Sequence, residues 1–259
     1  MRYILLTISL LVVFVDAAPL FGQSATPPTA TSSPAPRRPS PLRAIGHTFY
    51  SEKSELFAEF RPLLVGQPNR FTAHLTRLGT LFTPYTEGEA TLTLETAGKL
   101  NYREIIQKPA APGIFRFAVK PETTGLSKIT ISFVTSVGTE QFVIDGVMVY
   151  DTESAAVASQ PKPEPETGDV AYYKEKSWLV PFATAPVALG KLAGANVLLV
   201  PQKALIRANG GVYVYRQQDP EHFRKQAVTI GRTDAENAEV LSGLRAGDRI
   251  VTVGADQIN

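Results

Sequence analysis

The 259-residue sequence predicts an all-β protein built from two small domains. From Ile45 to Tyr150, short runs of alternating apolar and polar residues are separated by turn residues about every ten positions, which is typical of a β-sandwich. A second group of short β-type runs lies between Val197 and Gly254. No long apolar heptad or helical period occurs, so we expect no helical hairpin.

Alternation in the first group indicates strands that bury one face each, and we assign residues 45–151 to an immunoglobulin-like β-sandwich. In one of these strands Phe71, Ala73 and Leu75 face the core, which places His74 on the solvent face. Such a fold supports binding and assembly but implies no chemistry by itself. The other expected strands lie near residues 56–60, 92–94, 115–119, 129–133, 141–144 and 147–150.

The second group predicts a compact antiparallel β domain over residues 170–259. Asn209-Gly210 lies between two apolar runs, and both residues accept the positive φ that tight hairpin turns require. We expect a strand near Ser177 to Thr184 to pair with the strands of this group. Four aromatic residues near the start of this domain are expected to pack in its core; the alternative is that they form a platform that binds a ligand. These are Tyr172, Tyr173, Trp178 and Phe182.

Residues 1–23 have the composition of a secretory signal peptide: Arg2, an apolar run from Ile4 to Val15, and then small residues. About a dozen apolar residues suit a signal peptide, whereas a spanning helix needs roughly 20. We therefore expect an exported, periplasmic protein with a cleaved signal. An uncleaved anchor is the alternative, through which the chain would associate with the membrane at its N-terminus.

Two proline-rich segments predict connectors without a core. Residues 24–44 contain six prolines among small polar residues and are expected to form a disordered tether. Residues 152–169 contain Pro161, Pro163 and Pro165 and are expected to run as a stiff, solvated linker.

Composition excludes several classes of function. The formal net charge of +2 favours no nucleic-acid partner, and the absence of cysteine excludes disulfides and thiolate chemistry. No hydrolase motif or phosphate-binding loop occurs, so we expect no enzyme activity, no catalytic residues and no cofactor. The carboxylate pairs Glu87/Glu89 and Glu164/Glu166 lie on turns and linkers, where solvation explains them.

The histidines give no metal-binding pattern. His47, His74 and His222 show none of the short ligand spacings of a strand or helix site, and Met148 is the one methionine outside the expected signal. We therefore expect isolated surface histidines and assign no metal ligands. The alternative is a metal chaperone in which folding brings His47 and His74 together.

Four blocks between residues 200 and 251 occur in an order that resembles the C-terminal part of a known family. That family is the periplasmic adaptor subunits, or membrane fusion proteins, of resistance-nodulation-division (RND) efflux pumps, especially the heavy-metal branch of the CzcB and CusB type. Residues 47–60 and 112–116 likewise resemble the extra N-terminal domain of some heavy-metal adaptors. The four blocks are Val200, Pro201, Ala204 and Leu205; Gly210, Tyr213 and Val214; Val228 and Gly231; and Gly243, Leu244, Gly247, Asp248, Ile250 and Val251.

The resemblance implies a structural role in efflux of cations or drugs, with a proton-driven inner-membrane transporter as partner. A complete adaptor would insert its central domains, including a helical hairpin, where only residues 188–196 intervene. We therefore expect an internally shortened adaptor that does not reach an outer-membrane channel. Two alternatives stay open: a free-standing exported binding module, and a non-functional remnant of an adaptor gene.

Overall fold

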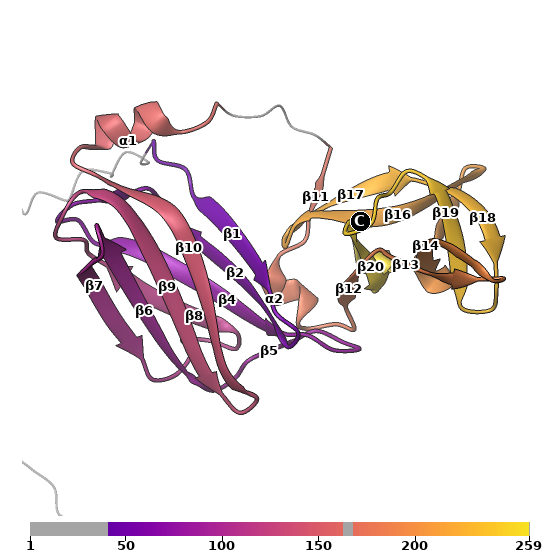
Figure 1. Cartoon of the computed structure of the whole chain (residues 1–259), viewed down its shortest axis with the longest axis horizontal. Coiled ribbons are helices and arrows are strands. Elements are labelled where there is room, and N and C mark those ends of the chain that lie inside the picture. The colour runs from indigo at the N-terminus through magenta and orange to yellow at the C-terminus, as the bar shows by residue number, and fades with distance from the viewer. Residues whose placement is uncertain (1–40, 163–167, 259) are drawn as a thin grey trace, which may run out of the picture. The chain divides into compact units, whose positions relative to one another are not determined.

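The computed structural model describes residues 41–162 and 168–258, so the expected signal peptide and nearly all of the proline-rich tether lie outside the described residues. Within the described ranges the regular secondary structure consists of strands and a few short helices, as the all-β prediction requires, and there is no helical hairpin (Figure 1). No helix in these ranges has the length and apolar character needed to span a membrane.

The N-terminal sandwich consists of two five-stranded sheets. One has the order β1-β2-β4-β5, with β8 also paired to β4, and the other has the order β3-β10-β9-β6-β7. The strands are β1 (Ile45–Tyr50), β2 (Ser54–Phe60), β3 (Leu63–Leu64), β4 (Asn69–Arg77), β5 (Thr83–Pro84), β6 (Glu89–Thr96), β7 (Lys99–Ile106), β8 (Ile114–Val119), β9 (Gly125–Thr135) and β10 (Gly138–Tyr150).

The predicted alternation places large side chains between the two sheets. In β6 every second residue is buried, and Phe71, Phe115 and Phe133 are fully buried in one continuous core. Some details differ from the prediction. The strands β1, β3, β5 and β7 were not predicted. The two strands expected around Asp145-Gly146 are a single strand, β10, whose pairing register shifts between Ile144 and Val147.

The C-terminal domain contains a six-stranded sheet, β11-β17-β16-β20-β12 with β15 paired to β16, and a four-stranded sheet, β13-β14-β19-β18. Its strands are β11 (Val170–Ala171), β12 (Ala183–Pro186), β13 (Ala188–Leu192), β14 (Ala195–Pro201), β15 (Ile206–Ala208), β16 (Gly211–Asp219), β17 (His222–Ala227), β18 (Thr229–Thr233), β19 (Asn237–Ser242) and β20 (Arg249–Val253). The helix α2 (Lys174–Ser177) and the short 3₁₀ helices η1 (Gln202–Ala204) and η2 (Ala255–Gln257) complete it.

Two-residue turns with positive φ close two hairpins of this domain. Asn209 and Gly210 have φ of 49° and 75°, so the predicted hairpin forms between β15 and β16. Ala193 and Gly194 have φ of 48° and 82° and close a hairpin of β13 and β14. Residues 188–196, where the family resemblance implies missing central domains, belong to a regular β-hairpin.

Two predicted segments have different secondary structure. The prediction of a solvated linker was wrong for its first residues, because they form the helix α1 (Glu153–Ser159). Thr152 caps this helix: its hydroxyl accepts a hydrogen bond from the Ala155 amide at 3.3 Å. Ala156 in this helix packs with Leu42, at the end of the expected tether, and with Leu64. Burying these apolar side chains favours an ordered helix over a solvated spacer.

The strand expected from Ser177 to Thr184 begins later than predicted. The helix α2 (Lys174–Ser177) occupies its start, and only Ala183–Pro186 forms β12. Its expected pairing with the C-terminal strands does occur, because β12 pairs antiparallel with β20. The side chain of Ser177 donates a hydrogen bond to the Lys174 carbonyl at 2.7 Å, a contact within the helix that an extended strand would not make.

Candidate functional site at the domain junction

A buried ion pair joins the two domains. Lys174 of α2 contacts the carboxylate of Glu55 on β2, and both side chains are excluded from solvent. The backbone amide of Lys174 donates a hydrogen bond to Oε1 of Glu221 at 2.9 Å. Lys174 therefore connects the sandwich, α2 and the turn between β16 and β17.

Trp178, just after α2, lies against the same face of the sandwich. Its Nε1 donates a hydrogen bond to Oγ1 of Thr76 at 3.1 Å, and its ring centroid lies 6.3 Å from that of His74. Gly113 makes room for the indole: a Cβ atom there would come within 2.4 Å of it. The outer face of β4 is thus covered by the segment that follows the linker.

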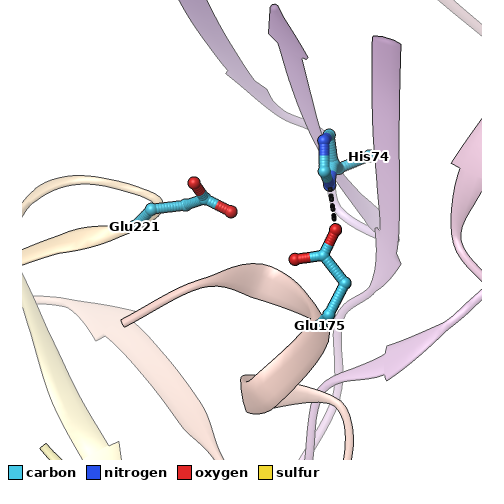
Figure 2. A group of neighbouring side chains, drawn as sticks. All are labelled: His74, Glu175 and Glu221. Carbon is cyan, nitrogen blue, oxygen red and sulfur yellow. Dashed lines mark ion pairs between the residues drawn. The ribbon is translucent and has the colours of Figure 1, made fainter. Parts of the chain in front are cut away.

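His74 on β4 is the centre of a cluster of ionisable groups. Its Nδ1 lies 3.8 Å from Oε1 of Glu175, and its Nε2 lies 3.6 Å from Oε2 of Glu59. Figure 2 shows the carboxylates of Glu175 and Glu221 pointing toward the imidazole from different elements. The prediction that His74 faces solvent was wrong: only 5% of its surface is exposed, because α2 and Trp178 pack over it.

Glu221 is the second buried member of this cluster, with 7% of its surface exposed. Burial raises the pKa of Glu221, while the Lys174 amide and the nearby His74 act in the opposite direction. The charges of Glu59 and Glu175 raise it further. Three carboxylates therefore share one small, partly desolvated space with a single imidazole.

The arrangement has the donor chemistry of a cation site. One ligand atom each from His74, Glu175 and Glu221 lies within 4.8 Å of the others. Imidazole nitrogen and carboxylate oxygen are ligands for divalent ions such as Zn²⁺.

The other histidines do not join this cluster. His47 stacks on Phe60 at a ring-centroid distance of 5.6 Å, and burial lowers its pKa. His222 is exposed and its Nδ1 lies 2.9 Å from a carboxylate oxygen of Asp219. The convergence of His47 and His74 at one ligand site, considered as an alternative, is therefore not among the described clusters.

The other residues that the sequence analysis considered as candidates lie outside this cluster. Tyr172 and Phe182 pack in a core of the C-terminal domain, whereas Tyr173 is exposed. Glu89 accepts a hydrogen bond from Gln107 at 2.9 Å, and Glu87 is exposed. The pair Glu164/Glu166 lies outside the described residues.

Sequence reasoning did not single out Glu175 or Glu221. They approach His74 from α2 and from the turn between β16 and β17, so no fixed spacing in the sequence relates the three residues. The sequence signals were weak: a single histidine within a strand, and two glutamates next to turns.

The C-terminal domain is similar to a domain of a known protein family. Residues 196–257 match the family model of the C-terminal permuted SH3 domain of RND membrane fusion proteins. The multidrug resistance protein MdtA of Salmonella heidelberg (strain SL476) is 38% identical over 63 residues, and that of Cronobacter turicensis is 36% identical over 63 residues. These matches cover 24% of this chain and 15% of each relative.

One solved structure also shares sequence with this chain. It is an NMR structure of a 180-residue fragment of SilB from Cupriavidus metallidurans CH34 that encompasses its N-terminal metal-binding site and membrane-proximal domain. The identity is 36%, and the match covers 28% of this chain and 41% of the other, with a TM-score of 0.26.

Proposed function

We propose that this chain, which carries the C-terminal permuted SH3 domain of RND membrane fusion proteins at residues 196–257, is a short periplasmic adaptor subunit with a structural role in efflux. The family match carries this proposal. The role is assembly rather than catalysis, and the substrate of the transporter would be a cation or a drug. The chain spans only a small part of the length of its curated relatives, so the role of the whole protein rests on this one domain.

The proposed partner is a proton-driven inner-membrane transporter, contacted through the C-terminal domain. Two observations support an adaptor with limited reach. The described residues contain no helical hairpin, and the hairpin of β13 and β14 continues directly into the matched domain through the turn Ala193-Gly194. We therefore propose that the chain docks on the transporter without contacting an outer-membrane channel.

Site-specific photocrosslinking in the native host tests this docking. A photoreactive amino acid replaces Leu241, an exposed residue of β19 in the matched domain, in one variant. The matched control carries it at Leu100 of β7 in the sandwich, where the exposure is similar, 63% against 61%. We expect the Leu241 variant to crosslink to a transporter and the Leu100 variant to give no such product.

The same experiment separates the alternatives. Recovery of an outer-membrane channel from the C-terminal domain would contradict the limited reach. Failure to capture a transporter from Leu241 and from Leu189 of β13, a second exposed position, would favour a free-standing exported binding module.

A further inference from the structure

We propose that His74, Glu175 and Glu221 form a binding site for one divalent metal ion, with Zn²⁺ as the preferred ion, at the junction of the two domains. This site uses no residue of the matched segment other than Glu221, and it does not require the adaptor role. It departs from the sequence analysis, which assigned no metal ligands.

The geometry is close to that of a three-ligand site. Zn²⁺ binds imidazole nitrogen and carboxylate oxygen at about 2.0 to 2.2 Å, which in a tetrahedron separates two ligand atoms by about 3.4 Å. The distance from Nδ1 of His74 to Oε1 of Glu175 is 3.8 Å, and the three ligand atoms lie within 4.8 Å of one another. The side chain of Glu175 is 50% exposed, so a rotation of this side chain can close the remaining gap.

The buried imidazole has a free ligand atom on the required side. Nδ1 of His74 is excluded from solvent and has no hydrogen-bond partner in the described part of the chain. A buried polar atom without a partner is unfavourable, and coordination to an ion would satisfy it. This atom is the one that faces Glu175, as Figure 2 shows.

Glu59 supplies the outer contact that metal-binding histidines commonly have. Its carboxylate faces Nε2 of His74 at 3.6 Å, opposite the atom proposed as the ligand. A carboxylate on the far nitrogen favours the tautomer that leaves Nδ1 free to coordinate, and it helps to fix the orientation of the ring. The ring of Phe57 also packs beside the imidazole, with its centroid 5.6 Å from that of His74.

Local charge also favours a cation. Glu59, Glu175 and Glu221 surround His74, while the neighbouring Lys174 is occupied by Glu55. Bringing carboxylates together in a partly buried space is costly unless a positive charge compensates them. A divalent ion would provide that charge, and the exposed side of Glu175 leaves a path for it from solvent.

The ion would connect elements of both domains, because His74 belongs to β4 whereas Glu175 and Glu221 belong to α2 and to the turn between β16 and β17. An ion that binds the folded chain and not the unfolded chain stabilises the folded state. The proposed site would therefore strengthen the junction that Lys174 and Trp178 already form.

Metal binding is measured on the full chain, purified without a polyhistidine tag. Titration with Zn²⁺ alone, followed by calorimetry and by elemental analysis after dialysis, should give one ion per chain. Co²⁺ serves as a second probe: Trp178 is the single tryptophan and lies beside His74, so bound Co²⁺ should quench its fluorescence, and Zn²⁺ should reverse the quenching.

Three variants and one control define the site. We expect His74→Gln and Glu175→Gln each to weaken Zn²⁺ binding at least about 10-fold, and Glu59→Gln to weaken it about 10- to 100-fold as an outer contact. The control His222→Gln removes an exposed histidine that also lies beside a carboxylate, and it should bind Zn²⁺ as the parent chain does. Glu175→Gln changes a half-exposed side chain, so it remains informative if His74→Gln does not fold.

Either of two results would overturn the site: equal Zn²⁺ affinity in the parent chain and in Glu175→Gln, or loss of binding in His222→Gln with binding kept in His74→Gln. Quenching by Co²⁺ that persists in both His74→Gln and Glu175→Gln would likewise place the ion elsewhere.

Discussion

The two domains differ in how they fill their cores. The sandwich encloses one continuous core between two sheets, in which Phe71, Phe115 and Phe133 are fully buried. The C-terminal domain has two smaller cores. One contains only aliphatic side chains, such as Val200 and Val214, and the other is completed by Phe82, which belongs to the sandwich.

The difference indicates that the C-terminal domain depends on its neighbour. A small domain buries a smaller share of its surface than a large one and is less stable by itself. Here the deficit is reduced at the junction, where the Phe82 ring packs edge-on against Phe182, 6.4 Å between centroids, and the Phe82 amide donates a hydrogen bond to the Phe182 carbonyl at 2.8 Å. Breaking the junction should therefore affect the C-terminal domain more than the sandwich.

The largest effect is expected for Lys174→Met. This change leaves the Glu55 carboxylate buried without its partner, which should lower the free energy of unfolding by about 3 to 5 kcal/mol. Chemical denaturation followed by Trp178 fluorescence measures it. The double variant Glu55→Met with Lys174→Met removes both charges and should recover most of the loss; equal instability in the double variant would contradict the ion-pair explanation.

Phe82→Ala is expected to have a similar or slightly smaller effect, about 3 kcal/mol, because it opens a cavity in a core of the C-terminal domain. Hydrogen exchange should show increased opening of β17 and β20 with little change in β6 and β9. Greater opening of the sandwich than of the C-terminal strands would contradict the dependence inferred from the two cores.

Gly113→Ala should destabilise by about 2 kcal/mol. The backbone at Gly113 has φ of 75°, which disfavours alanine, and the added Cβ atom would overlap the Trp178 ring. The indole should move toward water, with a red shift of its emission. Gly98→Ala is the matched control, since φ there is 73° with no atom close to the new Cβ; an equal red shift in both variants would exclude the contact as the cause.

The smallest effect concerns acid stability at the far sheet of the C-terminal domain. Hydrogen bonds from the Arg232 guanidinium and amide lower the pKa of Glu239 to about 2. Because the folded pKa is below the ordinary value of 4.5, the contribution of this carboxylate to stability is present above pH about 4.5 and is lost as pH falls through about 2.

Carboxyl-carbon NMR measures this pKa directly. Arg232→Gln should return the Glu239 midpoint toward its ordinary range, with little change in overall stability because the Arg232 side chain is largely exposed to solvent. A Glu239 midpoint near the ordinary value in the parent chain would contradict the hydrogen bonds described.

Local patterns explain which parts of the fold were predictable. Alternation predicted the buried face of β6, and Asn209-Gly210 predicted its hairpin because both residues accept positive φ. The corresponding turns at Ala97-Gly98 and Ala193-Gly194 were not predicted, since alanine has no such preference. The turn at Ala97-Gly98 joins β6 to β7, so β7 was not predicted either.

By itself, the sequence determined the all-β class and the C-terminal pattern that the family comparison confirmed, because strand alternation and turn chemistry involve residues close together in the chain. It did not determine the environment of His74. The alternation rule gives the two faces of β4 but does not say that α2 would cover the outer one. Only tertiary packing decided that His74, Glu175 and Glu221 meet and that Phe82 completes the core of the other domain, since those contacts join segments distant in sequence.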